Sequence, residues 1–451
     1  MKYPIKKTCI PILAFVLTGC QKYLDEKSDK SLSVGASVKD VQALLDYNAL
    51  FNGNCAEGEA SSDNYFLTDQ KWSGLYEEDD RSLYIWGNDL FTNTNNSNGW
   101  SISYQQVYYA NVAIEKLNTI DRSDNADGWN NAMGQALFSR GKALFTVACT
   151  WAKVFDSSTA DNTPGIPLRV NSDFNTVSQR SSLEMTLKQI LSDLSNSVFY
   201  LPKSPIHVMR PSREAAYAML ARIYLYMGDY AKANGYADST LAFHRELLDF
   251  NVLDPNKNYP IAQFNKEVIY SETGYLTPID ESFAAIDTSF YGQFSAHDLR
   301  KDIFFRAYSE MDKRIVFKGS YDGSANKFCG LAIDEVYLIK AECQLKMGNA
   351  MNALLFLNEL SSKRYGAGFL PYRSNDKDEI SGFIQQERRK ELVMRNLRWY
   401  DLKRLNREGY NIWLRRKLNG KEYVLPPNSP RYALPIPAYV LKQSGMEQNG
   451  Y

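Results

Sequence analysis

Between about residues 53 and 100, aromatic side chains alternate with hydrogen-bonding side chains in a pattern that suits sugar recognition. Three of the seven tryptophans fall in this span. Aromatic rings stack on the apolar faces of sugars, while carboxylates and carboxamides pair with the hydroxyls. We therefore predict a carbohydrate-binding site in this span, with Trp72 and Trp100 as its first candidates. The further candidates are Tyr65, Tyr76, Trp86, Asp63, Asn64 and Asp69.

A second aromatic cluster lies in the segment SFYGQFSAHDLR, residues 289–300. We expect Tyr291 and Phe294 to complete an arc of rings around the ligand. The competing interpretation is that several rings in both segments fix long loops to the rest of the protein. Trp151 and Trp399 lie in helical patterns, and for these two we predict a place in the core.

Four adjacent acidic residues in YEEDDRS, Tyr76–Ser82, raise the question of catalysis. An enzyme that cleaves glycosidic bonds needs two carboxyl groups at a set separation across the sugar, which a sequence does not define. The cluster also lacks the alternating oxygen ligands of a calcium loop. We interpret it as a solvated acidic loop in preference to a catalytic or calcium site.

Other chemistries find little support in the sequence. It contains no H-E-x-x-H, no G-x-S-x-G and no phosphate-loop motif. The three histidines are not at metal-ligand spacing, and no C-x-x-C pair occurs. Cys149 and Cys343 lie in apolar helical patterns and are expected to be small core residues. We expect no enzyme activity, no cofactor and no metal site.

The segment Gln386–Leu405 is rich in arginine and lysine, which raises the possibility of nucleic-acid binding. Its charges are, however, paired along a helix: Glu391 lies four residues before Arg395, and Arg398 lies three before Asp401. The whole chain carries 52 basic and 52 acidic residues, without the basic excess that nucleic acid requires. We predict a structural charge network on a half-buried helix and no nucleic-acid partner.

The first twenty residues are typical of an export signal. Lys2, Lys6 and Lys7 precede an apolar run that is too short to span a membrane, and the run ends in Leu-Thr-Gly-Cys. This ending resembles the bacterial lipobox. We predict a signal peptide over residues 1–19, acylation of Cys20, and a polar tether over 20–36. The alternative is an ordinary signal peptide with an incidental cysteine.

The rest of the chain, 37–451, is predicted to be one helical domain. Residues 135–156 carry apolar side chains at spacings of three and four, as in a helix that packs one face into a core. Ala221–Ala233 and Ala341–Ala353 share Ala, Leu, Met-Gly and Ala at the same offsets. This pattern is typical of tetratricopeptide helix hairpins. We predict a mostly α, tetratricopeptide-like scaffold with minor β structure and large irregular insertions near 53–100 and 245–330.

These motifs, taken in order, resemble the SusD/RagB family of outer-membrane nutrient-binding lipoproteins of Bacteroidetes. The similarity runs through CQKYLD, YYANVAIEKL, DNTPGIPL and the two hairpin segments. It is strongest in QERRKELVMRNLRWYDLKRL and in the closing LPIPAYVLKQSGMEQNGY. The chain lacks the proline that the family usually has between Asn449 and Gly450, which alters only a terminal loop.

The resemblance implies a lipid-anchored receptor on the outer face of the outer membrane, which captures oligosaccharides. It also implies a partner, a TonB-dependent transporter barrel of the SusC type, to which the ligand is delivered. Two alternatives remain open. The protein could be a peptide receptor of the same lid-and-barrel system, or an all-helical enzyme that cleaves glycans with acidic loop residues.

Overall fold

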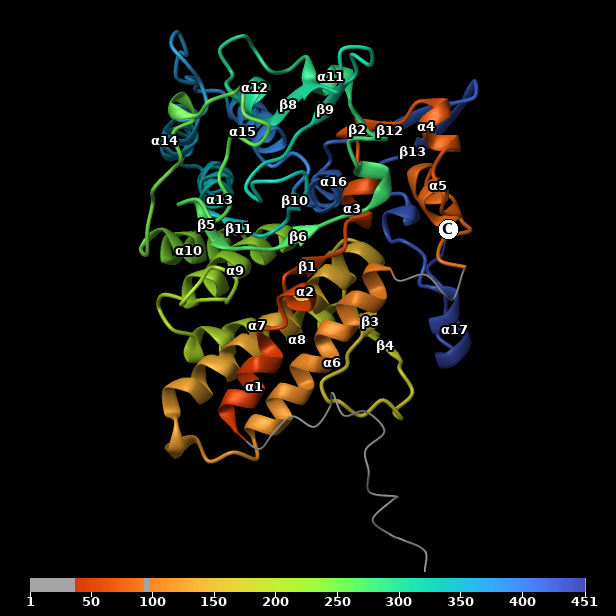
Figure 1. Cartoon of the computed structure of the whole chain (residues 1–451), viewed down its shortest axis with the longest axis vertical. Helices are drawn as coiled ribbons and strands as arrows, with labels where there is room; N and C mark the ends of the chain where they lie inside the picture. The colour runs from red at the N-terminus through yellow and green to blue at the C-terminus, as the bar shows by residue number, and fades with distance from the viewer. Residues whose placement is uncertain (1–36, 93–97, 451) are drawn as a thin grey trace, which may run out of the picture.

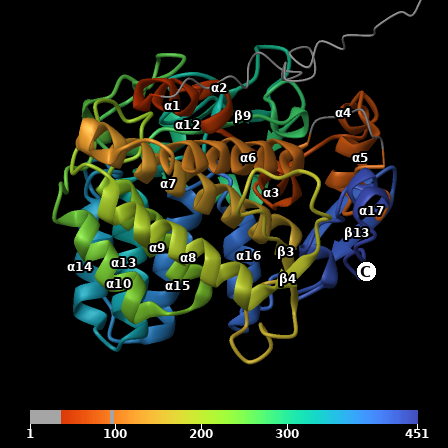
Figure 2. The ribbon, with the colours of Figure 1, turned by 90° about the horizontal axis from the view of Figure 1, so that it is seen from below.

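The computed structural model describes residues 37–92 and 98–450, and its helices form a curved array in which each packs on the next (Figures 1 and 2). The array consists of α6 (Gly99–Leu117), α7 (Ala126–Trp151), α8 (Leu183–Tyr200), α9 (Arg213–Met227), α10 (Tyr230–Leu241), α13 (Ile333–Lys346), α14 (Ala350–Ser361) and α15 (Lys377–Glu391). The mostly helical fold is therefore confirmed. The predicted signal peptide over 1–19, Cys20 and the tether over 20–36 lie outside the described residues.

The two segments with similar sequences form two similar helix hairpins. α9 and α10 turn at Gly228 with φ +85°, and α13 and α14 turn at Gly348 with φ +89°. Glycine adopts this left-handed conformation without steric cost, so both turns have it at the same place in the motif, and the two helices end within one residue of each other in that motif. Because α10 packs against α13, the two hairpins are neighbours in space although the chain separates them widely. This arrangement confirms the tetratricopeptide-like prediction.

α7 is the central helix of the scaffold. All twenty residues from Ala132 to Trp151 are buried, because α6, α8 and α16 (Arg398–Arg407) surround it. Its one deep arginine, Arg140, pairs with Asp193 of α8 at 2.6 Å, so that this buried charge is compensated. Trp151, Trp399, Cys149 and Cys343 are all fully buried, as predicted.

The first insertion is built of short elements that follow two N-terminal helices. Those helices are α1 (Val38–Leu45) and α2 (Asn48–Phe51); the insertion contains β1 (Gly53–Asn54), α3 (Glu57–Ser61), β2 (Tyr65–Phe66), α4 (Asp69–Ser73) and α5 (Glu78–Tyr84). A separate two-stranded arm, β3 (Pro164–Pro167) and β4 (Arg180–Ser182), leaves the scaffold between α7 and α8. A short 3-10 helix, η3 (Arg122–Asp124), precedes α7.

The second insertion, between α10 and α13, has the strand character that the sequence indicated. It contains η4 (Phe250–Val252), β5 (Val268–Tyr270), β6 (Thr273–Gly274), η5 (Thr277–Ile279), β7 (Ala285–Ile286), α11 (Thr288–Tyr291), α12 (Arg300–Phe304), β8 (Phe305–Ala307), β9 (Ile315–Phe317), β10 (Lys327–Phe328) and β11 (Leu331–Ala332). β8 pairs with β9, and β5 pairs with β11, which leads directly into α13.

Two strand pairings join the insertions to each other. β1 runs parallel to β6, with Gly53 opposite Thr273, and β2 runs antiparallel to β7, with Tyr65 opposite Ile286. Figure 1 shows the joined insertions together above the helices α1, α6 and α7. Segments more than 200 residues apart in the chain thereby meet and can build one site.

The segment Gln386–Leu405 is two helices, so the prediction of one continuous helix is wrong. α15 ends at Glu391 and α16 begins at Arg398; between them Met394 and Asn396 have φ of +57° and +59°. The side chain of Asn396 donates to the Cys55 carbonyl at 2.6 Å, and its backbone N–H donates to Glu59 at 3.0 Å. These contacts, with Glu59 of α3 and with Cys55 shortly before that helix, hold the break. The chain then forms β12 (Leu414–Leu418), β13 (Lys421–Leu425), η6 (Pro430–Tyr432) and α17 (Ala438–Ser444).

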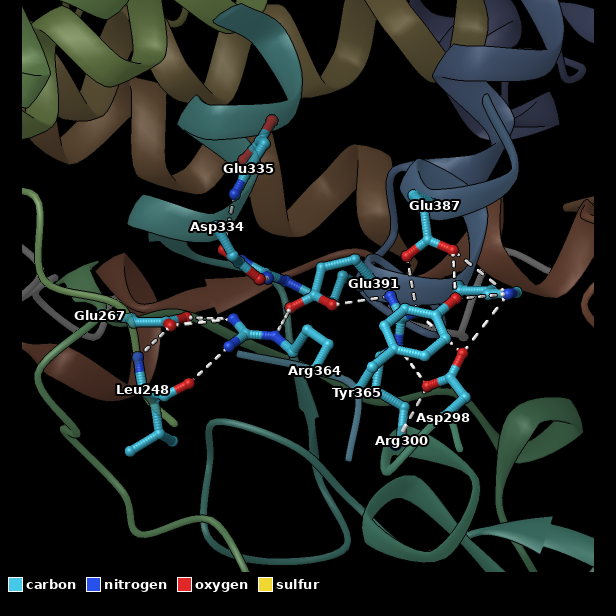
Figure 3. A network of polar contacts seen from close by, with 12 residues as sticks. Leu248, Glu267, Asp298, Arg300, Asp334, Glu335, Arg364, Tyr365, Glu387 and Glu391 are labelled. Atoms are coloured by element: carbon cyan, nitrogen blue, oxygen red, sulfur yellow. Dashed lines mark hydrogen bonds and ion pairs between the residues drawn. The ribbon is translucent and has the colours of Figure 1, made fainter. Parts of the chain in front are cut away.

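The basic segment forms a charge network, as predicted, but the network is fully buried and joins distant parts of the chain (Figure 3). Glu391 accepts from Arg364 at 2.6 Å and from Arg300 at 3.0 Å, and Arg364 also contacts Glu267 at 2.8 Å. Arg395 pairs with Asp334 and not with Glu391. Carboxylate oxygens of Glu267, Asp334 and Glu391 lie within 4.8 Å of one another, and guanidinium groups supply the positive charge at this cluster.

Candidate functional site

A cavity of about 330 Å³ lies where the two insertions meet. The first insertion contributes most of its polar wall, including Glu57, Asp79, Asp80 and Asn98, and the second contributes Tyr275 and Thr277. η5 packs against both α3 and α5, and this contact brings the two walls together. Both insertions carry residues predicted to bind ligand, and residues of both insertions line this cavity.

The position of Glu57 depends on a glycine at the start of α6. The backbone N–H of Gly99 donates to Oε1 of Glu57 at 2.5 Å. A side chain at Gly99 would collide with Cys55, because an added Cβ would lie 2.1 Å from the Cβ of that residue. Oε2 of Glu57 is buried and accepts no hydrogen bond from the part of the chain that the structure describes. One buried carboxylate oxygen thus remains unpaired in the cavity wall.

Three carboxyl groups of this cavity, those of Glu57, Asp79 and Asp80, hold their protons more tightly than exposed ones do. Burial raises the pKa of Asp80 to about 7, although a hydrogen bond with Thr277 acts in the opposite direction. Burial also raises the pKa of Glu57 and of Asp79. Asp79 is held in place by the backbone N–H of Phe91, which donates to it at 2.7 Å. Near neutral pH the wall therefore offers both donors and acceptors of hydrogen bonds, as a polyhydroxylated ligand needs.

Exposed aromatic rings lie at or beside the cavity. Tyr275, immediately after β6, lines it and is 62% exposed. Tyr76 is 90% exposed and is followed in the chain by Glu77, which also lines the cavity. Tyr76 was among the predicted ligand contacts, and that role remains a prediction. Tyr275 was missed because it is a lone tyrosine between two short strands, without an aromatic neighbour in the sequence.

Three of the predicted rings are buried, so the expectation that they face a ligand from the surface is wrong. Tyr65 is 3% exposed and donates to the Ala60 carbonyl at 2.6 Å; Trp86 is 3% exposed and donates to the Ser61 carbonyl at 3.0 Å. The guanidinium of Arg416, from β12, lies over both rings. Phe294 is 2% exposed and packs edge-on against Phe305.

Trp72 and Tyr291 are half-buried and Trp100 is buried, and the contact of these three rings with ligand remains a prediction. Trp72 is half-buried, and its indole N–H donates to the Arg81 carbonyl at 3.1 Å. Tyr291 is half-buried against Phe305. Trp100 is 4% exposed and lines a second cavity, on α6.

The three polar residues predicted to contact ligand, Asp63, Asn64 and Asp69, form hydrogen bonds or ion pairs with other residues of the protein. Asp63 pairs with Arg398 at 2.7 Å, and Asn64, 1% exposed, donates to Glu59 at 2.9 Å. Asp69 accepts from the backbone N–H of Asn419 at 2.9 Å. The contacts of Asp63 and Asp69 fasten the first insertion to the C-terminal part of the chain. The polar groups of the cavity are instead Glu57, Asp79, Asp80, Asn98 and Thr277.

The acidic cluster Tyr76–Ser82 is only partly solvated, because α5 turns the last two of its four acids inward. Asp80 is 7% exposed, and Asp79 is half-buried. The interpretation of a solvated loop is therefore wrong for these two residues. The reason is that α5 packs on α3 and η5, whose positions depend on pairings distant in sequence.

Among the helices of residues 37–92 and 98–450, none is both long and apolar enough to cross a membrane. Two family profiles match the chain. One, described as starch-binding and associating with the outer membrane, matches residues 22–225; the other, described as the SusD family, matches residues 319–451.

Known proteins resemble the chain in sequence and in fold. Two SusD-like proteins of Formosa agariphila are 23% and 24% identical, each over 68% of this chain and over 72% and 71% of the relative. A SusD superfamily structure from Bacteroides thetaiotaomicron has a TM-score of 0.74 at 20% identity, covering 92% of this chain and 100% of that one. A structure from Bacteroides vulgatus described as a putative sugar binding protein has a TM-score of 0.76 at 19% identity, covering 92% and 99%. The two profiles, the relatives and the shared fold together show that the chain belongs to the SusD/RagB family.

Proposed function

We propose that the protein is a lipid-anchored receptor on the outer surface of the outer membrane that binds nutrient oligosaccharides. It delivers them to a partner TonB-dependent transporter of the SusC type and does not cleave them. The observation that carries this proposal is the cavity between the two insertions, where buried carboxyl groups face Asn98, Thr277 and the exposed ring of Tyr275. Carbohydrate recognition needs this combination of hydrogen-bonding groups and an apolar ring face.

The similar proteins support the choice of ligand and of location. One matching profile is described as starch-binding and associating with the outer membrane, and one structural neighbour is described as a putative sugar binding protein. The lipobox-like sequence that ends at Cys20 supports anchoring by lipid. Acyl chains on this residue would hold the protein at the membrane without a spanning helix.

A glycan-cleaving enzyme is the second candidate function, because Asp80 and Glu57 both have raised pKa values in one cavity. A carboxyl group that keeps its proton near neutral pH can act as a general acid. A peptide receptor is the third. It would read a peptide backbone with the same carboxyl and carboxamide groups.

One titration separates these functions. A soluble form that begins after Cys20 is titrated by calorimetry with plant, host and microbial oligosaccharides and with peptides, and each mixture is then analysed by chromatography. We expect heat from one class of glycan, which is recovered at its original length. Shortened products would show an enzyme, and heat from peptides alone would show a peptide receptor.

The anchor and the partner need their own test in the native bacterium. We expect the wild-type chain to carry acyl chains and to co-purify with a transporter barrel from outer membranes. The Cys20→Ser variant should lack the acyl mass and leave the membrane fraction. Retention of the variant in that fraction, without acyl chains, would contradict the lipid anchor.

A further inference from the structure

A second cavity, of about 450 Å³, opens along α6 and takes no part in the site between the insertions. It lies between α6, the arm formed by β3, β4 and residues 168–179 between them, and α17 near the end of the chain (Figure 1). Ser101 and Trp100 line it, whereas Asn98, at the helix start, lines the first cavity. The two cavities therefore adjoin the same end of α6.

The floor of the second cavity is a ladder of aromatic rings on one face of α6. Trp100, Tyr104 and Tyr108 follow each other at intervals of four residues, which corresponds to about 6 Å along a helix. This interval is comparable with the length of one hexose unit in an oligosaccharide. Tyr104 is fixed by a hydrogen bond from its hydroxyl to the Pro167 carbonyl at 2.7 Å, and its ring centroid lies 5.0 Å from that of Trp100. Rings held in this way lose little entropy when a ligand stacks on them.

The opposite wall presents apolar side chains that are largely exposed to solvent. Phe174 and Val177, on the arm, are 78% and 62% exposed. Arg169 fixes the arm, because its guanidinium donates to the Thr176 carbonyl at 2.6 Å and to the Ser178 hydroxyl at 3.2 Å. A fixed loop that holds an exposed ring opposite other rings is suited to hold a ligand between them.

The polar groups of this cavity favour an uncharged, hydroxyl-rich ligand. Within the described residues, the Tyr108 hydroxyl and the Gln443 carboxamide line the cavity without a hydrogen-bond partner. Arg169 is the charged residue of the lining, and its donors are directed at carbonyl and hydroxyl groups of the arm. Free donors and acceptors beside aromatic rings suit sugar hydroxyls better than a purely apolar molecule.

We infer that this cavity is a second carbohydrate-binding subsite, in which a neutral oligosaccharide lies on Tyr104 and Tyr108 and contacts Phe174. The choice of a carbohydrate as occupant rests on the proposed function, whereas the location of the subsite rests on the geometry of α6, the arm and α17. An oligosaccharide that is long enough to reach both cavities would bind at two places near the N-terminal end of α6.

The test uses the full-length chain in detergent and five defined probes: maltohexaose, cellohexaose, laminarihexaose, xylohexaose and mannohexaose. Affinities are measured by calorimetry for the wild type and for the Tyr108→Ala and Phe174→Ala variants. Phe199→Ala is the matched control, because Phe199 on α8 is 73% exposed and lies outside the cavity. We expect at least one probe to bind, with affinity at least tenfold lower in both subsite variants and unchanged in the control.

The Tyr275→Ala variant separates this inference from the proposed function. Loss of affinity in Tyr108→Ala and Phe174→Ala but not in Tyr275→Ala would leave the second subsite standing and contradict the role of the first cavity. Loss in Tyr275→Ala alone would overturn the second subsite. Failure of all five probes to bind at millimolar concentration would overturn it as well, because a neutral oligosaccharide is the occupant inferred.

Discussion

Arg398 and Asp63 form a two-bond ion pair across 335 residues of sequence, with Nε–Oδ1 and Nη2–Oδ2 distances of 2.7 and 2.9 Å. Arg389 of α15 contacts the same carboxylate at 3.2 Å. One carboxylate in the first insertion is thus held by both of the C-terminal helices α15 and α16. It fastens the segment that carries the first cavity to the scaffold.

Replacing Asp63 should destabilise the fold. Burial alone would raise the pKa of Asp63, but Arg389 and Arg398 outweigh it and hold that pKa well below its usual value. Asp63→Asn leaves two poorly exposed guanidinium groups without their counter-charge, and we expect it to lower the free energy of unfolding by about 2 kcal/mol. Urea denaturation at pH 7 measures this change.

The pH dependence gives this prediction its control. The pKa is depressed, so the stabilisation is present above the unfolded pKa of Asp63 and is lost as pH falls towards the folded value. The difference in the free energy of unfolding between wild type and Asp63→Asn should therefore become smaller at acid pH. Glu310→Gln, in an exposed pair with Lys313, should cost less than about 0.5 kcal/mol. An equal cost for the two variants would contradict the role given to Asp63.

The ionisation of Asp80 should lower the free energy of unfolding as pH rises. Burial raises its pKa to about 7, so the folded chain keeps a proton that the unfolded chain loses near pH 4. Stability then falls between about pH 4 and 7 and levels off above. At pH 8 we expect Asp80→Asn to be more stable than the wild type, by on the order of 1–2 kcal/mol. Thermal unfolding at pH 5 and pH 8 measures the stabilisation by Asp80→Asn. A stabilisation of the same size at both pH values would contradict the raised pKa of Asp80.

Two glycines near the first hairpin should respond to alanine with opposite signs. Gly228 turns the chain between α9 and α10 with φ +85°, so Gly228→Ala should destabilise by about 1 kcal/mol. Gly235 lies within α10, and an added Cβ there meets nothing within 4 Å. Gly235→Ala should stabilise by about 0.5–1 kcal/mol, because alanine is the better helix former. Urea midpoints of the two variants check the pair; a shift of the same sign in both would be inconsistent with the turn.

Arg416 should stabilise the first insertion through its planar guanidinium. That group lies 3.9 Å from the centroid of Tyr84 and 4.7 Å from that of Trp86, and it donates to the Ala60 carbonyl at 3.1 Å. Lysine lacks the planar, forked guanidinium group, so Arg416→Lys should lower the free energy of unfolding by about 2 kcal/mol. Arg415→Lys, next to it in an exposed pair with Glu422, is the control and should cost less than about 0.5 kcal/mol. Comparable urea midpoints for the two variants would contradict this role.

Local patterns predicted the scaffold well, because its helices and turns are encoded by nearby residues. The Met-Gly pairs that end at Gly228 and Gly348 indicated both hairpins. Apolar spacing placed Trp151 in the core. In each case the sequence signal spans only a few neighbouring residues.

Long-range contacts explain what the sequence did not predict. Tyr65 and Trp86 are buried because Arg416, more than 300 residues away, covers them. The break at Asn396 depends on Glu59 of α3, which accepts from the backbone N–H of Asn396. Arg389 and Arg398 pair with Asp63 of the first insertion, and Glu391 pairs with Arg300 of the second. Tyr275 reaches the first cavity through the pairing of β1 with β6 and the packing of η5 against α3 and α5. Periodicity carries no information about such pairings.

The most direct measurement is a calorimetric titration of the wild type and of Tyr275→Ala with the same oligosaccharide, followed by chromatography of the sugar. If the cavity between the insertions is the receptor site, the wild type binds, Tyr275→Ala binds at least tenfold more weakly, and the sugar is recovered at full length. Equal affinities for the two proteins, or a shortened sugar, would contradict a non-cleaving receptor with its site in this cavity.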